Sequence, residues 1–251
     1  LSPAKIFLLA SLSTIVYLSH IFNFMLLGII IFVNEIQYAL YSRKIRQAFK
    51  QFLYPTLILL PGVILSVLFV VSNSSFKHSP PIYLSNDRLL QTIIDLSPVI
   101  TLNYDSEVGF AHIILYTLCV LLLMVIIDFF RKRKQALRFR PYWLASSLIV
   151  LLLFFLFPDW IASGGFISIR WALFFFLMII ILIAAKGLSP NQLFLPVAVL
   201  LTTHVFFILY HNEQTKILSE DAVTLVGAED FMEDNTVLLP LNYSNNWIQI
   251  N

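Results

Sequence analysis

Long apolar stretches separated by short polar segments dominate the sequence. A helix needs about 20 apolar residues to cross the roughly 30 Å hydrocarbon core of a membrane. The stretches that fit this requirement are Phe52–Val71, Val108–Ile127, Tyr142–Ala162, Phe166–Ala185 and Leu193–Tyr210. Their apolar residues are continuous rather than alternating, so the pattern predicts transmembrane helices and excludes β-barrel strands.

The first apolar region, Ile6–Val33, allows two interpretations. It can form one long tilted helix, since tilt accommodates excess length. It can also form two helices that break at His20–Asn23, and we favour this second interpretation. The sequence therefore predicts an all-α integral membrane protein with six or seven transmembrane helices.

Lysine and arginine residues gather in alternate connections between these helices. The loops 43–50 and 131–140 are strongly basic, whereas the long connection 72–107 contains only Lys77 and Arg88. Basic loops stay on the cytoplasmic side of a membrane. We therefore expect both basic loops to be cytoplasmic and the acidic segment after Tyr210 to lie outside, with the bacterial inner membrane as the expected location.

Two segments outside the apolar stretches predict further structure. Within the outer loop 72–107, Asn86–Ile94 is typical of a capped amphipathic helix at the membrane interface. After the transmembrane domain 1–210, the extracytoplasmic segment 211–251 contains an expected strand at Thr236–Leu241. That strand predicts the start of a small α/β or β domain. Because the chain begins at Leu1 rather than Met, we expect it to be the C-terminal part of a longer protein.

The composition supports a membrane protein. Hydrophobic residues make up 59% of the chain and charged residues 12%, against roughly 25% charged residues in soluble domains. The formal net charge of +2 is too small to indicate nucleic-acid binding. Cys119 is the single cysteine, which excludes an intramolecular disulfide and argues against a cysteine metal site.

Polar residues at the predicted outer ends of the helices are the candidate functional residues. They are His20, His112, Asp159, Gly164, Gly165 and Arg170. They share one predicted depth, so they can line a common cavity. Arg170 stands at a helix N-terminus, which favours anions, and its guanidinium with the Gly-Gly turn suits a phosphate. The alternatives for Arg170 are contact with lipid headgroups or an ion pair with Asp159.

Other ionisable residues predict structural roles. Glu35 and Asp128 lie near the basic loops, where pairing with Lys or Arg is expected. His204 lies deep in its helix and is expected to hydrogen bond to a neighbouring helix. The spacing of His20, Asp105, Glu107 and His112 matches no compact ligand motif. A divalent metal at these four residues is therefore possible in principle but not supported by their spacing, and the sequence shows no evident cofactor.

Short segments of the chain resemble a known family. Tyr17–His20, Gly164–Arg170 and Val237–Leu241 are similar to segments of bacterial multi-spanning membrane proteins grouped with the GT-C-fold glycosyltransferases. The resemblance implies a polyprenyl-phosphate sugar donor and an active site on the non-cytoplasmic side. It also implies that Arg170 contacts the donor phosphate, while His20 and His112 line the donor cavity. The catalytic acidic loop of that family is not visible in this chain.

Two further functions are compatible with the sequence. One is a secondary transporter, although the chain has no internal repeat of the kind such proteins use. The other is a non-catalytic membrane component of an envelope polysaccharide or export assembly. The expected partners are membrane lipid and, as the family resemblance implies, a polyprenyl-phosphate-linked sugar.

Overall fold

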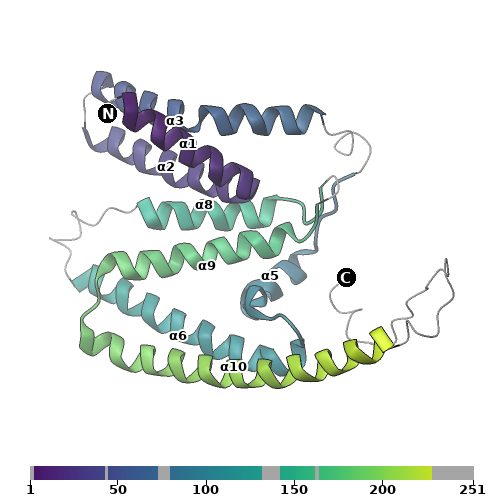
Figure 1. Cartoon of the computed structure of the whole chain (residues 1–251). Helices are drawn as coiled ribbons and strands as arrows, with labels where there is room; N and C mark the ends of the chain where they lie inside the picture. Colours follow the sequence, from purple (N-terminus) through teal and green to yellow (C-terminus); the bar gives the residue numbers. More distant parts are fainter. Residues whose placement is uncertain (1–2, 43–44, 73–79, 132–141, 162–163, 228–251) are drawn as a thin grey trace, which may run out of the picture.

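A computed structural model describes residues 3–42, 45–72, 80–131, 142–161 and 164–227 (Figure 1). These residues form helices, with two isolated β-bridges in the connections. The helices are α1 (Pro3–Ser19), α2 (Ile21–Ser42), α3 (Ile45–Ser72), α5 (Asn86–Ile94), α6 (Tyr104–Arg131), α8 (Tyr142–Leu156), α9 (Ile167–Lys186) and α10 (Pro190–Gly227), with a short 3-10 helix η1 (Ser97–Val99).

Four helices are long and apolar enough to cross a membrane. Their apolar parts are Phe52–Ser72, Tyr104–Asp128, Ile167–Lys186 and Pro190–Glu220. The apolar helices Pro3–Ser19, Ile21–Gln37 and Trp143–Leu156 are shorter. The predicted all-helical, membrane-type fold is therefore confirmed at the level of helix content and hydropathy, while the count of six or seven spans stays a prediction.

The first apolar region forms two helices, as the favoured interpretation predicts. α1 ends at Ser19 and α2 begins at Ile21. The side chain of His20 supports the break, because its Nδ1 accepts the backbone N–H of Phe22 at 3.2 Å. A side chain that accepts an N–H in the first turn compensates for a hydrogen bond that the helix cannot make there.

The N-terminal helices pack as a group of three. α1 contacts α2 and α3, and α2 also contacts α3 (Figure 1). Ser13 of α1, which is buried, donates its hydroxyl to the carbonyl of Ile58 in α3 at 2.6 Å. Gly62 of α3 lies against the ring of Phe24 in α2. A small residue and an interhelical hydrogen bond are typical of close helix packing in membranes.

α9 is the central helix of the remaining structure (Figure 1). It packs beside α8 and contacts α6, while α10 packs along α6 and α2 contacts α8. Of the apolar part of α9, 56% is buried, against 11% for α10. The apolar side chains that α10 leaves exposed are the surface expected of a helix that faces lipid.

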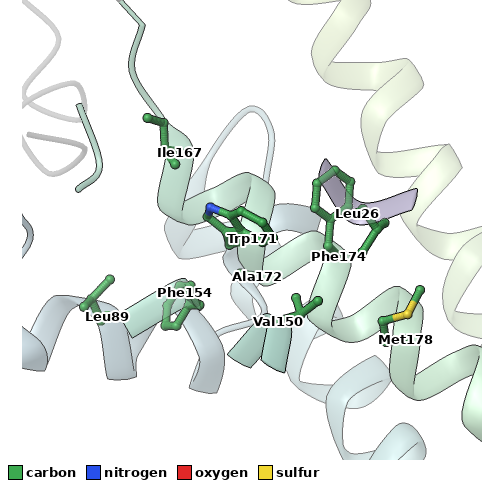
Figure 2. Close-up of a cluster of buried hydrophobic side chains, with 9 residues drawn as sticks. All are labelled: Leu26, Leu89, Val150, Phe154, Ile167, Trp171, Ala172, Phe174 and Met178. Atoms are coloured by element: carbon green, nitrogen blue, oxygen red, sulfur yellow. The ribbon is translucent and has the colours of Figure 1, made fainter. Parts of the chain in front are cut away.

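A hydrophobic core surrounds Trp171 of α9 (Figure 2). Val150 and Phe154 of α8 are fully buried against it, and Leu89 brings α5 into the same cluster. The ring of Trp171 makes an edge-to-face contact with Phe22 of α2, with centroids 6.0 Å apart, a geometry that aromatic pairs prefer. This core fixes the positions of the three segments that converge at one end of α9.

The amphipathic helix in the segment 72–107 has the bounds that the sequence predicts. α5 covers Asn86–Ile94, and the hydroxyl of Ser85 accepts the backbone N–H of Arg88 at its start. After α5, Leu96 adopts a left-handed conformation with φ 50° and buries its side chain in a second cluster with α6 and α9. The expected strand at Thr236–Leu241 lies outside the described residues.

Candidate functional site

A cleft of about 590 Å³ lies where α5, the segment 97–105 and the start of α9 meet. The start of α6 borders it, whereas the basic loop 131–140 follows the opposite end of that helix. The cleft is therefore at the end predicted to be non-cytoplasmic. Its charged and polar lining residues include Arg88, Gln91, Asp95, Asn103, Tyr104, Asp105 and Asp159.

Asp95 is the most deeply buried carboxyl group of this lining, with 6% of the residue exposed. It ends α5 as the C-cap residue. Its Oδ2 accepts the hydroxyl of Tyr104, and its Oδ1 lies 3.1 Å from Nε2 of His112. Gln91 donates its amide to the hydroxyl oxygen of Tyr104 at 3.2 Å. Both oxygens of the buried Asp95 carboxyl group therefore have a partner, which fixes the orientation of Asp95.

Glu107 holds the segment 101–103 on the rim of the cleft. Its carboxylate is fully buried and accepts the backbone N–H groups of Thr101, Leu102 and Asn103 at 2.6 to 3.0 Å. Nε2 of His211, in the polar part of α10, lies 3.4 Å from the same carboxylate. Because the three N–H groups compensate for its burial, Glu107 is a structural residue that keeps the rim in place.

Asp159 lines the cleft and also organises the turn between α8 and α9. Its Oδ1 accepts the backbone N–H of Ser168 at 3.0 Å, and its carbonyl accepts the N–H of Ile167 at 3.1 Å. These are the first N–H groups of α9, which otherwise lack partners. The anion expected at this helix N-terminus is therefore the side chain of Asp159 itself.

Gly164 and Gly165 complete the same turn. The N–H and carbonyl of Gly164 both bond to Ile161, at 3.0 and 2.9 Å. Gly165 lies directly against the indole of Trp160, where any side chain would overlap the ring. The N–H of Gly164, predicted to contact a phosphate, thus donates to the carbonyl of Ile161 instead.

Arg170 and His20 lie together beside α2. The guanidinium of Arg170 stacks over the ring of Phe22, with Cζ 5.6 Å from the centroid. His20 faces the same ring, with centroids 5.5 Å apart. Partial burial, and secondly the charge of Arg170, lower the pKa of His20 below its usual value of 6.5. The imidazole is therefore neutral at neutral pH, and Arg170 is the cation of this pair.

The structure brings the predicted residues together in two groups rather than one. Asp159 lines the cleft and His112 reaches it through Asp95, whereas His20 and Arg170 are outside the lining. Ile169 of the lining is the residue directly before Arg170 on α9, so the two groups are neighbours along this helix. Among the described ion pairs, none joins Arg170 to Asp159. The described residues contain no cluster of three potential metal ligands.

Two other ionisable residues have clear environments. Asp128 forms an ion pair with Lys186, with Oδ2 and Nζ 3.2 Å apart, so the predicted pairing with a basic residue is present. His204 has an exposed side chain on α10 rather than a position between helices. Among the described residues, the expected hydrogen bond to a neighbouring helix is not formed on this exposed face, because α10 lies at the edge of the bundle.

Sequence reasoning missed Asp95 and Tyr104, which form the centre of this hydrogen-bond network. One signal points to Asp95: an acidic residue directly after a helix is opposed by the helix dipole. Such a residue implies a compensating partner from another part of the chain. Tyr104 and His112 supply it from α6, at separations of 9 and 17 residues that match no fixed motif.

Comparisons with known proteins give no relative. No protein-family model, no curated protein and no solved structure matches this chain. Functional inference therefore depends on the residues of the cleft and of the adjoining Arg170 group.

Proposed function

We propose that this chain is a glycosyltransferase-like membrane protein that uses a polyprenyl-phosphate-linked sugar on the non-cytoplasmic side of the membrane. The observation that carries the proposal is the polar cleft of about 590 Å³ at the end of an otherwise apolar helical bundle. Polar groups within a membrane-embedded bundle are costly, so they are candidates for function by default. A lipid-linked sugar fits both features, because its lipid can lie along the apolar helices while its polar sugar lies in the cleft.

The chemistry of the cleft favours a sugar. Its lining contains three carboxyl groups, on Asp95, Asp105 and Asp159, beside the amides of Gln91 and Asn103. Carboxylates accept hydrogen bonds from hydroxyl groups, and amides both donate and accept them. The lining holds these three carboxyl groups against one guanidinium, that of Arg88, so its negative excess disfavours a phosphate. We therefore assign the cleft to the sugar rather than to the phosphate of the donor.

Arg170 is our candidate for the phosphate of the same donor. Its guanidinium is partly exposed, and the neighbouring His20 is neutral, so this group provides one positive charge. Ile169, which lines the cleft, directly precedes Arg170 on α9. A guanidinium binds phosphate through two parallel hydrogen bonds. The sugar and the phosphate thus occupy adjoining positions.

Donor binding in nanodiscs tests this assignment. The probe is a radiolabelled polyprenyl-phosphate-linked sugar, and the variants are Arg170→Ala and His20→Ala. Loss of a charged hydrogen bond is worth about 1.5–3 kcal/mol, so we expect Arg170→Ala to weaken donor binding by about tenfold or more. The matched controls are Arg131→Ala and His204→Ala, because both side chains are exposed away from the cleft.

Two results would count against the proposal. Unchanged donor binding in both test variants would remove the assignment of Arg170 and His20. Absence of donor binding and of sugar transfer in the unmodified chain would reject the glycosyltransferase-like function itself. In that case, a non-catalytic role in an envelope assembly becomes the better explanation.

A further inference from the structure

We propose that Asp95 is the catalytic base of the cleft and that Tyr104 and His112 are its positioning residues. This inference rests on the proposed function, because it names the group that activates the acceptor. It starts from an unusual placement: a carboxyl group that is 6% exposed, lines the cleft and ends a short helix. The helix dipole opposes a carboxylate at this position, so the fold maintains it with specific partners.

Those partners constrain how the carboxylate is presented. The hydroxyl of Tyr104 donates to Oδ2, while Nε2 of His112 lies 3.1 Å from Oδ1. An ionised carboxylate only accepts hydrogen bonds, so Nε2 carries the proton in this contact. Each carboxylate oxygen has a second lone pair. The network therefore orients Asp95 and leaves it able to accept one more hydroxyl group from the cleft.

The surrounding cleft distinguishes Asp95 from the other two carboxyl groups. Asp159 uses Oδ1 to hold the start of α9 at Ser168. Asp105 is exposed in the first turn of α6. Among the described hydrogen bonds, Asp105 takes part through its backbone N–H rather than through its carboxyl group. Asp95 alone of these three is both buried and aligned by two side chains from another helix. Alignment of this kind is what general-base catalysis requires.

The reaction step follows from this geometry. An acceptor hydroxyl donates its hydrogen bond to Asp95, and its oxygen attacks the anomeric carbon of the donor sugar. The new bond from oxygen to the anomeric carbon forms while the bond from that carbon to the phosphate oxygen breaks. The proton passes to Asp95, and the electron pair leaves with the polyprenyl phosphate. His112 and Tyr104 keep the carboxylate in place during this transfer.

The decisive experiment compares Asp95→Asn with Asp87→Asn in nanodiscs that contain the labelled donor. Sugar transfer to membrane acceptors and release of free sugar to water are both measured at saturating donor. Loss of a general base lowers the rate by about 100-fold or more, so we expect this loss in kcat for Asp95→Asn with the donor Kd unchanged. Asp87 is exposed on the same helix and outside the cleft lining, so Asp87→Asn is expected to retain the rate.

Variants of the partners keep the test valid if Asp95→Asn does not fold. We expect His112→Gln and Tyr104→Phe each to lower kcat by about tenfold, with little change in KM for the donor. Combined with Asp95→Asn, either substitution is expected to add little, because residues that act as a unit are not additive. A uniformly structural role would instead change protein yield and stability without separating kcat from KM.

The possible failures are distinct. If the unmodified chain transfers sugar and Asp95→Asn does so at the same rate, Asp95 is not the base and the proposed function stands. Full kcat in both His112→Gln and Tyr104→Phe also overturns the inference when Asp95→Asn does not fold. If the unmodified chain neither transfers nor releases sugar, the proposed function fails and the inference fails with it.

Discussion

Gly165 lies against the indole ring of Trp160, so closely that a side chain at position 165 would overlap the ring. The backbone N–H groups of Asp159 and Trp160 donate to the carbonyl of Ile82, and the carbonyl of Trp160 accepts the N–H of Ile82. These bonds join the turn to the segment before α5. Glycine at position 165 therefore allows the backbone to lie against the ring of Trp160. Neither Gly164 nor Gly165 has the positive φ that would require glycine for its conformation.

Substitution of each glycine in turn tests whether packing against Trp160 requires glycine at position 165. We expect Gly165→Ala to displace Trp160 and to lower the free energy of unfolding by about 1–3 kcal/mol, the usual cost of overpacking. Gly164→Ala is the matched control, because its new methyl group would meet only the carbonyl of Ile161 at 3.7 Å. Thermal unfolding in detergent and tryptophan fluorescence measure the difference. Equal stability of the two variants would contradict the packing explanation.

His20 provides a pH-dependent test of the Arg170 group. Partial burial and the charge of Arg170 both lower the pKa of His20, because both disfavour the protonated imidazole. Arg170→Gln removes the second cause and keeps the first. We therefore expect the pKa of His20 to rise in this variant and to stay below its ordinary value of 6.5.

The measurement is a pH titration of the His20 ring signals by NMR in nanodiscs, assigned with His20→Ala. Arg88→Gln is the control, since Arg88 is exposed on α5 and is absent from the causes of the shift. A fall in the pKa of His20 in Arg170→Gln, or an equal rise in Arg88→Gln, would show that Arg170 is not the neighbouring charge.

The sequence predicts the helices well because hydrophobic runs report directly on local structure. The break at His20 and the bounds of α5 follow from local signals, namely a polar interruption and a capped amphipathic pattern. The arrangement of the site does not follow, because it depends on contacts between distant segments. Asp95 meets His112 only after the left-handed residue Leu96 reverses the chain, and no spacing in the sequence encodes that reversal.

A shared depth in the membrane does not predict which of these residues line one cavity. His20, His112, Asp159 and Arg170 all occur at the same end of the helices. Depth does not specify which side of a helix a residue occupies. His20 and Arg170 both lie against the ring of Phe22 and outside the cleft lining, whereas Asp159 faces the cleft. The rotation of α2, α8 and α9 is set by packing around Trp171, which periodicity does not reveal in helices that are apolar all round.

Gly62 is expected to determine how closely α2 and α3 pack. A Cβ at this position would lie 2.5 Å from the ring of Phe24, which is buried. Gly62→Ala is therefore expected to be less stable than Gly28→Ala, which adds its methyl group where no atom lies within 4 Å. At Gly28, the change to alanine is expected to stabilise the helix by up to about 1 kcal/mol. Thermal unfolding of both variants tests this order, and a higher midpoint for Gly62→Ala would contradict it.

The ion pair between Asp128 and Lys186 is expected to couple α6 to the end of α9. Both side chains are mostly buried, at 20% and 12% exposed, so removal of one partner leaves a charge in a poorly hydrated position. We expect Asp128→Asn and Lys186→Gln each to destabilise the protein by about 1–3 kcal/mol. The double variant is expected to lose less than the sum of the two, and strict additivity would show that the pair is not coupled.

Cysteine labelling tests the orientation that places the cleft outside. In a Cys119→Ser background, Asp87→Cys on α5 and Arg131→Cys at the end of α6 introduce single exposed thiols near opposite ends of the helices. The positive-inside pattern predicts that a membrane-impermeant maleimide labels position 87 in intact spheroplasts of a bacterial host. Position 131 is expected to react only after the membrane is permeabilised. The reverse result would place the cleft in the cytoplasm, where the proposed non-cytoplasmic donor could not reach it.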